Sequence, residues 1–338
     1  MLMTLQQRIN ILVRLGNYMQ ENDEAWQSAK RKAFVNNNWF IEDFVDLAVN
    51  NIVQQLLQPE ALHQLAASYK IPDTLPAPKK VGIVMAGNIP LVGFHDFLCV
   101  FLSGHIALIK PSSKDEALIT QLVNLLHQWE PATQQTVAIL PLLKNCEAYI
   151  ATGSNNSSRY FEAYFSKFPH IIRKNRTSVA MLSGKESTTE LESLADDIYQ
   201  YFGLGCRNVT KLYVPVGYDF VPLINALRKY SHLTDHNKFK NNYDYQLAAK
   251  IINNEYYMTD GTILLIENKS PFAPISQVHY EYYEQADDVL QQLSGDEAIQ
   301  CVTGTAAIPF GGAQTPGICD FADGVDTMAF LMDLGSGN

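Results

Sequence analysis

VGIVMAGNIP (residues 81–90) and HIALIKPSS (residues 105–113) are the two stretches that decide the fold class. Each opens with a short apolar run of the length of a buried strand, and polar or small residues follow the run. A helical run separates them, and short apolar strands that alternate with helices predict βαβ units with a largely parallel sheet. Ligands of such sheets bind beyond the carboxyl ends of the strands, so we expect a cofactor at the loops after Met85, Ile109 and Thr152.

The same alternation continues through the rest of the chain. Helices are predicted at 115–129, 155–168, 189–202 and 220–230, and strands at 136–140, 147–154, 170–174, 178–182, 210–215 and 261–267. A capping box opens the helix at 189–202, because Glu190 lies three residues after Ser187. The segment 237–257 is rich in Asn, Lys and Tyr, and we assign it no element.

The first 77 residues have a different pattern, which is helical throughout. IEDFVDLAVNNIVQQLL (41–57) places apolar residues at helical spacing, and Pro59 opens a short helix that runs to Tyr69. PDTLPAPKK (72–80) then reads as a proline-rich linker and a domain boundary.

Composition and charge limit the classes of protein to which this chain can belong. A chain of 338 residues is long enough for about two domains, and 47% hydrophobic with 18% charged residues is an ordinary globular composition. The net charge of −10 argues against nonspecific nucleic-acid binding, which needs a basic surface. The most apolar window, 89–109, contains His95, Asp96 and His105, so we expect no membrane span.

The cysteines indicate the compartment. Five cysteines, widely spaced and without a Cys-x-x-Cys pair, fit a reducing cytosol and provide no zinc framework. We therefore expect a cytoplasmic protein without a metal site. The amphipathic first 15 residues do not resemble a signal peptide.

One of the five cysteines differs from the others. Cys99 and Cys301 lie in apolar runs and are expected to be inert core, whereas Cys146 and Cys319 each precede an acidic residue that disfavours a thiolate. Cys206 follows a glycine-lined turn and precedes Arg207. Glycines allow a substrate to approach the backbone, and cations lower a thiol pKa. The residues alone leave Cys206 as either a nucleophile or a buried structural thiol.

Seven short motifs in collinear order resemble the aldehyde dehydrogenase superfamily, and within it most closely the LuxC-type long-chain acyl-CoA/acyl-protein reductases. The motifs are AGNIP (86–90), IKPSS (109–113), ATGSN (151–155), MLSGKE (181–186), GLGCRN (203–208), SPFAPI (270–275) and IPFGG (308–312). The resemblance implies an α/β fold with a helical N-terminal segment (1–77), a Rossmann-like cofactor domain (78–183), an α/β catalytic domain (184–318) and a C-terminal tail that contacts a neighbouring subunit (319–338).

The resemblance also implies catalytic roles. Cys206 sits where the family has its nucleophile. Asn88 sits where the family has an asparagine whose amide, with the backbone N–H of the cysteine, forms the oxyanion hole. Without the resemblance, a turn residue at the end of a strand is the favoured interpretation of Asn88.

A cofactor site is implied in the same way. Lys110 matches the lysine that holds the adenosine ribose, Gly153 and Ser154 match the turn that opens a helix beneath the diphosphate, and Phe272 matches the aromatic on the nicotinamide ribose. The expected set is completed by Met85, Ala86, Ser112, Ser113, Leu182 and Ser183. From spacing alone, Lys110 is equally a solvated charge after a strand. Without the resemblance, the alternative for Gly153 and Ser154 is a plain helix cap, and Phe272 is more often core.

The chain departs from the family at informative positions. Met181 replaces the glutamate that activates water against the acyl-enzyme, which favours transfer between thiols over hydrolysis; nearby Glu186 is either a substitute base or a solvated charge. Ser113 replaces a glutamate that grips the ribose hydroxyls, and Lys114 follows, so NADPH is favoured with NADH as the alternative. Ser270 and Leu204 replace two further family residues on the nicotinamide side.

These features predict a reductase that converts an acyl-CoA or acyl-carrier thioester into a fatty aldehyde through an acyl group on Cys206. The alternatives are CoA-acylating oxidation of an aldehyde and a noncatalytic acyl- or nucleotide-binding scaffold. Arg173, Lys174, Arg176 and Lys185 form either a docking patch for CoA phosphates or an acidic carrier, or a solvated basic rim. Phe94, Phe97 and Phe101 recur at helical spacing and line either an acyl tunnel or the core. Related proteins also imply a homo-oligomer.

Overall fold

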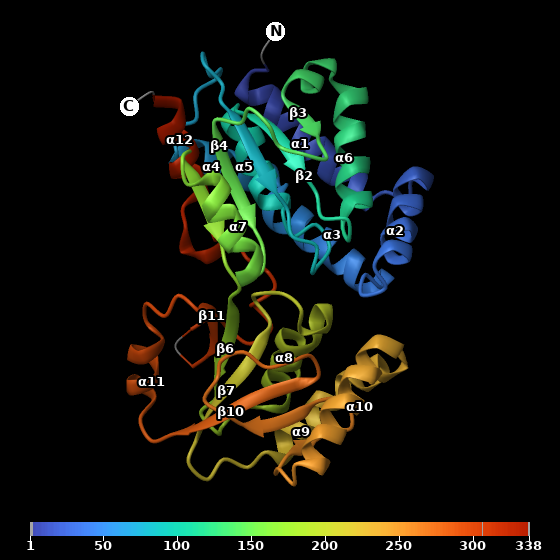
Figure 1. The fold of residues 1–338 in the computed structure, drawn as a ribbon, viewed down its shortest axis with the longest axis vertical. Helices are drawn as coiled ribbons and strands as arrows, with labels where there is room; N and C mark the ends of the chain where they lie inside the picture. Colours follow the sequence, from blue (N-terminus) through green and yellow to red (C-terminus); the bar gives the residue numbers. More distant parts are fainter. Residues whose placement is uncertain (1–2, 306, 337–338) are drawn as a thin grey trace. The chain divides into compact units, whose positions relative to one another are not determined.

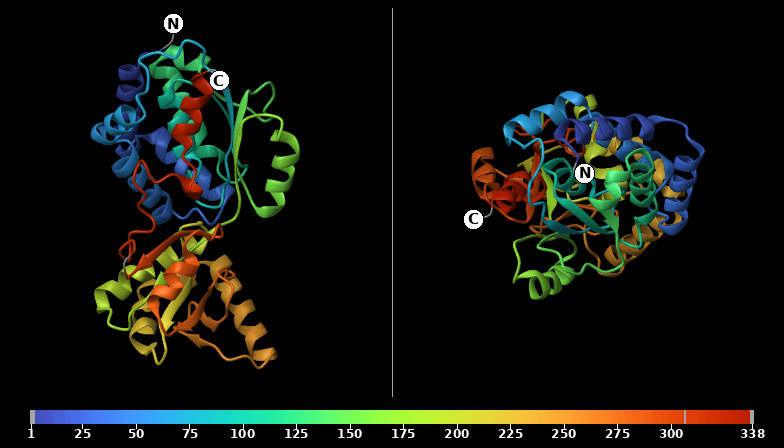
Figure 2. Two further views of the ribbon diagram at one scale, coloured as in Figure 1. Left: turned by 90° about the vertical axis from the view of Figure 1, so that its left-hand side faces the viewer. Right: turned by 90° about the horizontal axis from the view of Figure 1, so that it is seen from above.

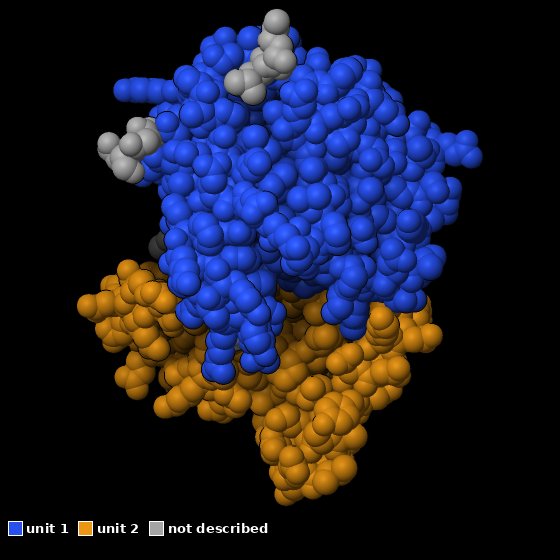
Figure 3. Space-filling view, turned by 45° about the horizontal axis from the view of Figure 1, so that its top comes forward, with its two compact units in different colours: residues 1–175, 316–338 blue, residues 176–315 orange. Residues whose placement is uncertain are grey.

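The computed structural model describes residues 3–305 and 307–336. The chain forms two compact units, which Figure 3 colours separately: unit 1 comprises residues 1–175 and 316–338, and unit 2 comprises residues 176–315. Unit 2 is therefore inserted into the sequence of unit 1. The four-part division expected from the sequence stays a prediction.

Unit 1 is built on a five-stranded parallel sheet (Figure 1). Its strands, in spatial order, are β3 (Val137–Ile139), β2 (Ile106–Lys110), β1 (Lys80–Val84), β4 (Ala148–Thr152) and β5 (His170–Arg173). Because the strands are parallel, their carboxyl ends lie along one edge, and the loops after β1, β2 and β4 share that edge.

Helices cover both faces of this sheet, as Figure 2 shows, with α7 on one face and the N-terminal helices and α12 on the other. The helices of unit 1 are α1 (Leu5–Gln20), α2 (Glu24–Asn36), α3 (Glu42–Leu56), α4 (Pro59–Ser68), α5 (Phe94–Ser103), α6 (Glu116–Trp129), α7 (Asn155–Phe165) and α12 (Thr327–Ser336), with 3-10 turns at Pro131–Gln135 and Ala322–Gly324. The helical N-terminal segment expected from the sequence is confirmed.

Helix α5 is the centre of the core of unit 1. Its sequence FHDFLCVFLS is apolar almost all round, and Phe94, Phe97 and Phe101 are each at most 2% exposed. A helix that is apolar on every side is stable only when other elements surround it. These three aromatic residues are therefore core, and the alternative of an acyl tunnel along them is not supported.

The C-terminal segment completes this core. Met328 and Leu331 of α12 are fully buried, and Nε2 of the buried His105 lies 2.9 Å from the Leu331 carbonyl oxygen. The His105 ring also accepts the Lys79 N–H at 3.0 Å, just before β1. Residues from the end of the sequence are thus held against the first strand of the sheet. The expected contact of this segment with a neighbouring subunit stays a prediction.

Unit 2 contains a six-stranded sheet with one antiparallel edge. Its order is β11 (Ile299–Gly304), β6 (Thr177–Met181), β7 (Val209–Pro215), β10 (Gln277–Tyr283), β9 (Leu264–Glu267) and β8 (Met258–Thr259). The short β8 pairs antiparallel to β9, and the other pairs are parallel. Its helices are α8 (Thr188–Tyr199), α9 (Val221–Leu227), α10 (Asn237–Ile252) and α11 (Ala286–Leu293), with 3-10 segments at Gln200–Gly203 and Arg228–Asp235.

The α/β fold class expected from the sequence is confirmed. The capping box at Ser187 and Glu190 is present at the start of α8. The segment 237–257, which had no assignment, contains α10; this helix buries only Phe239 and Tyr243, so its sequence carries little amphipathic signal. Among residues 3–305 and 307–336, no helix combines the length and apolarity needed to cross a membrane.

Candidate active site

Cys206 lies in unit 2, on the loop between the 3-10 segment Gln200–Gly203 and strand β7, and it is half-buried. Burial disfavours the thiolate form of the other four cysteines. Burial raises the pKa of the thiols of Cys99, Cys146, Cys301 and Cys319. A thiol is nucleophilic as its thiolate, so the raised pKa values argue against these four as the nucleophile.

The backbone of Cys206 is bonded to the central sheet. Ser178 of β6 donates its hydroxyl to the Cys206 carbonyl oxygen at 3.0 Å. The same hydroxyl lies 3.1 Å from the sulfur of Cys301 and accepts the Cys301 N–H at 3.2 Å. Cys301 was expected to be inert core, but it is half-buried. Its sulfur contacts the same Ser178 hydroxyl that bonds to the loop of the candidate nucleophile.

The chain enters this loop through a run of left-handed residues. Tyr201 (φ 54°), Phe202 (φ 57°) and Gly203 (φ 73°) follow one another. Non-glycine residues adopt this conformation only where the surroundings hold them. Packing of the buried Phe202 ring against Phe239, with centroids 5.5 Å apart, provides part of that support.

The loop that carries Asn88 follows β1 in unit 1, at the edge where the strands end. Asn88 is exposed. The chain just before it is fixed, because the Met85 N–H donates to the Lys110 carbonyl oxygen at 3.0 Å. A side chain at Gly87 would collide with Ser112, whose hydroxyl would be 2.6 Å from the added carbon. This glycine therefore permits the loop after β1 to pack directly on the loop after β2.

The buried carboxyl group of Asp115 also holds the loop after β1. Asp115 precedes α6, and its Oδ2 accepts the Leu91 N–H at 2.7 Å. Leu91 is left-handed (φ 55°) and buried, a conformation that needs such a hold. Burial raises the pKa of Asp115 well above its ordinary value, and its other oxygen has no partner in the described part of the chain.

The expected cofactor residues of unit 1 line the carboxyl edge of its sheet. Lys110 and Ser112 are half-buried and Ser113 is exposed. Ser154 caps α7 by accepting the Ser157 N–H at 3.3 Å, and α7 begins directly after the loop that follows β4. At Gly153 an added Cβ would lie 2.8 Å from the Phe161 ring and 2.9 Å from Ser157 Cβ, so a side chain there requires these neighbours to shift. A helix start with a close backbone approach suits a phosphate group.

Met85 and Ala86, two further expected cofactor residues of unit 1, differ in how deeply their side chains are buried. The Met85 side chain is buried against Gly93, so only its backbone faces the loop. Ala86 is half-buried beside it.

The expected cofactor residues of unit 2 also differ in access. Leu182 is fully buried; its N–H donates to the Tyr213 carbonyl oxygen at 3.0 Å, and its carbonyl oxygen accepts the Tyr283 hydroxyl at 2.6 Å. Ser183 is exposed and Phe272 is half-buried, so Phe272 is not a core residue. The cofactor roles of these residues stay predictions.

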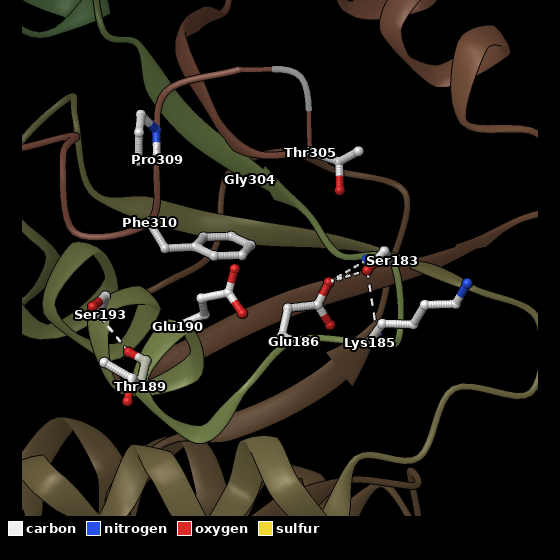
Figure 4. A pocket seen from close by; sticks show the side chains of 10 residues that line it. All are labelled: Ser183, Lys185, Glu186, Thr189, Glu190, Ser193, Gly304, Thr305, Pro309 and Phe310. Atoms are coloured by element: carbon white, nitrogen blue, oxygen red, sulfur yellow. Dashed lines mark hydrogen bonds between the residues drawn. The ribbon is translucent and has the colours of Figure 1, made fainter.

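A pocket of about 270 Å³ opens in unit 2 at the carboxyl ends of β6 and β11 (Figure 4). Ser183, Lys185, Thr305 and Phe310 are among its lining residues. Glu186 also lines it, but this carboxylate closes the turn before α8: it accepts the N–H and hydroxyl of Ser183 and the N–H of Gly184. Glu186 is therefore a turn-forming residue, which favours neither a base nor a fully solvated charge.

The structure corrects the expected basic cluster. Arg173 is 2% exposed and forms a buried ion pair with Asp96 of α5. Its guanidinium also donates to the Thr327 hydroxyl at 2.8 Å. Arg173 thus holds β5, α5 and α12 together and belongs neither to a docking patch nor to a solvated rim. Lys185 is exposed, and Lys174 pairs with Glu162 at 3.0 Å.

Asn88 and Cys206 belong to different units, so their pairing across an oxyanion hole stays a prediction. Within each unit, the structure does bring motif residues together: the loops after β1, β2 and β4 in unit 1, and the loops at 181–186 and 304–310 in unit 2. Sequence reasoning missed Ser178, Asp197 and Asn208, which support the Cys206 loop. Their partners are distant in sequence or are backbone groups, and no motif spacing signals such contacts.

The fold places the chain in a known class. An aldehyde dehydrogenase from Bacillus cereus, solved as its NAD+ complex, superposes with a TM-score of 0.62 at 12% identity, over 89% of this chain and 72% of that one. An NAD-dependent aldehyde dehydrogenase from Sinorhizobium meliloti gives 0.64 at 11% identity over 89% and 70%. An NADP dependent enzyme from E. coli gives 0.63 at 12% identity over 89% and 73%. The chain therefore has the aldehyde dehydrogenase fold.

The family is narrower than the fold. The family model of the acyl-CoA reductase LuxC matches residues 49–261, well over half of the chain. The protein belongs to the LuxC family of acyl-CoA reductases. No curated protein is similar enough in sequence to be matched to it.

Proposed function

We propose that this protein reduces an acyl thioester to a fatty aldehyde with NADPH, using Cys206 as the nucleophile. The observation that carries the proposal is the state of the five cysteines. Cys206 is half-buried on a loop bonded to the sheet. Burial raises the pKa of the other four thiols, which disfavours their thiolates. Membership of the LuxC family supports the reaction class.

In the first step the Cys206 thiolate attacks the carbonyl carbon of the acyl thioester. A carbon–sulfur bond forms to Cys206, the bond to the original thiol breaks, and CoA or a carrier thiol leaves with the electron pair. One thioester replaces another, so the step is nearly balanced in free energy and its rate depends on positioning. Asn88 and the Cys206 N–H are the proposed donors to the oxygen that becomes negatively charged.

A bound NADPH supplies the hydride that reduces the acyl carbonyl. The oxyanion on the resulting thiohemiacetal is stabilised by the same two donors. Collapse of this oxyanion expels the Cys206 thiolate and releases the aldehyde. The reverse sequence is CoA-acylating oxidation of an aldehyde, and the supply of substrates decides the direction.

The absence of a carboxylate at position 181 supports thiol transfer over hydrolysis. Met181 is fully buried among Val179, Tyr213 and their apolar neighbours. Residue 181 therefore provides no general base that could activate a water molecule. Hydrolysis of an acyl group on Cys206 is therefore expected to be slow.

The preference for NADPH rests on the loop after β2. Ser113 and Lys114 are both exposed there, so no carboxylate at position 113 repels a 2′-phosphate and an ammonium group is available to pair with one. NADH is the alternative cofactor. A homo-oligomeric and cytoplasmic enzyme also stays part of the proposal.

Acyl capture tests the proposal directly. The protein is incubated with a panel of acyl-CoAs without NADPH, and the acyl mass is located by peptide mass spectrometry. We expect it on Cys206, with loss of labelling and of NADPH consumption in Cys206→Ser. Cys319→Ser is the matched control, because Cys319 is an exposed thiol in the other unit. Reductase activity with an unmodified Cys206 would reject the mechanism, and the lack of both acylation and turnover would favour a noncatalytic scaffold.

A further inference from the structure

Asn208 closes the loop that carries Cys206. Its Oδ1 accepts the Gly205 N–H at 2.8 Å, and its own N–H donates to the Gly205 carbonyl oxygen at 3.1 Å. Cys206 and Arg207 are the two residues between these ends. Asn208 is fully buried, so the closure is shielded from water.

The other end of the same amide group binds the end of α8. Its Nδ2 donates to the carbonyl oxygens of Asp197 at 3.0 Å and Gln200 at 2.8 Å. The last carbonyls of a helix lack partners within the helix, and here the chain turns left-handed directly afterwards, at Tyr201. One side chain therefore joins the end of α8 to the nucleophile loop.

We propose that Asn208 is a positioning residue for Cys206, a role that rests on the proposed function of this cysteine. Ser178 fixes the Cys206 carbonyl from the sheet, and Asn208 fixes the turn on either side of the cysteine. Together they set the direction of the Cys206 backbone, including the N–H that the mechanism assigns to the oxyanion. Asn208 itself touches no reacting atom.

The role requires both halves of an amide group. An asparagine accepts through its oxygen and donates through its nitrogen, whereas an ionised aspartate only accepts. Asn208→Asp preserves the bond to Gly205 but turns a carboxylate oxygen towards two carbonyl oxygens. Protonation would restore one donor, so this variant should recover function as the pH falls.

Other titratable groups near Asn208 must be separated from this effect. The side chain of Asp197 on α8, the Arg207 guanidinium in the loop, and the thiols of Cys206 and Cys301 (β11) lie on the elements around it. All are present in the wild type, so the ratio of the Asn208→Asp rate to the wild-type rate at each pH removes their shared contribution. The ratio retains the effect of the new carboxylate, both on the loop and on the neighbouring thiol.

The test measures acylation of Cys206 by acyl-CoA and its alkylation by iodoacetamide, both by mass spectrometry. We expect Asn208→Ala to slow acylation by about 100-fold, as expected for a misplaced nucleophile, with little change in the dissociation constant for NADPH. The Asn208→Asp to wild-type ratio should rise towards acid pH. The control is Asn241→Ala, because Asn241 is exposed on α10 of the same unit.

Circular dichroism before each assay identifies the folded fraction, and rates are expressed per folded molecule. Wild-type acylation and alkylation rates in folded Asn208→Ala would overturn the proposal, as would an Asn208→Asp ratio that does not change with pH. If wild-type Cys206 takes no acyl group at all, the proposed function fails. The iodoacetamide rates then still decide whether Asn208 positions the thiol.

Discussion

Asp197 on α8 is expected to make the protein less stable as the pH rises from about 4 to about 6. The side chain is fully buried, and its carboxylate accepts the Gly311 N–H at 2.8 Å and the Ala313 N–H at 3.0 Å. Burial raises the pKa of Asp197 from 3.8 to about 6, against the effect of these two hydrogen bonds. The folded state thus holds a proton that the unfolded state releases. Its contribution to stability is complete below pH 3.8 and is lost as the pH rises through about 6.

The size of this effect follows from the difference between the two pKa values. At about 1.4 kcal/mol per pKa unit, Asp197 lowers the free energy of unfolding by about 3 kcal/mol across this window. Asp197→Asn does not titrate, although it loses one acceptor and so has a constant offset. The advantage of wild type over Asp197→Asn should therefore shrink by about 3 kcal/mol between the acid and neutral ends.

Urea unfolding at a series of pH values measures this difference. All three tryptophans, Trp26, Trp39 and Trp129, lie in unit 1, so their fluorescence follows unit 1 and serves as an internal control. Hydrogen exchange at Gly311 and Ala313 follows unit 2, and far-UV circular dichroism reports the unfolding of both units. If the difference in the free energy of unfolding between wild type and Asp197→Asn stays constant with pH, the argument that burial raises the pKa of Asp197 is refuted.

Three further substitutions test the remaining features. Gly153→Ala should weaken NADPH binding about tenfold, because the new side chain meets Phe161 at 2.8 Å; isothermal calorimetry checks this, and unchanged binding would remove the loop from the cofactor site. Glu186→Gln should leave the reductase rate within about twofold, since loss of a general base typically costs ~100-fold or more; a loss of that size would make Glu186 a base. Arg173→Met should lower the free energy of unfolding by about 3–5 kcal/mol, because it leaves the buried Asp96 carboxylate unpaired; a melting temperature like that of wild type would contradict the buried pair.

The strands with strong local signals were predictable from the sequence. The run at 81–87 overlaps β1 (Lys80–Val84) and the run at 105–112 contains β2 (Ile106–Lys110), because consecutive apolar residues between turn signals describe a buried parallel strand. Strand β10 was not predicted, since the polar and aromatic residues of Gln277–Tyr283 lack an apolar run. Strand β11 was not predicted either, although Cys301 was placed in a short apolar run. Whether such a segment forms a central strand depends on the strands that pair with it, and a local sequence pattern does not identify those strands.

The loops of the candidate site were predictable from the sequence, because each of them carries a motif. The resemblance located the loops, and the parallel sheets explain why loops distant in sequence share an edge. Arg173 was misjudged because charge alone suggests exposure, whereas its partner Asp96 lies 77 residues away. Asn208 has a polar side chain of ordinary appearance, and its importance comes from backbone groups of α8 that only the folded chain brings near.

The return of residues 316–338 to unit 1 affects how the polypeptide is made. Helix α12 fills part of the core around α5 with Met328 and Leu331, and these residues leave the ribosome after all of unit 2. During synthesis the first 175 residues must therefore wait, with an apolar surface uncovered, while the inserted unit is completed. We expect nascent chains stalled before residue 316 to engage chaperones that release them once the final helix has docked.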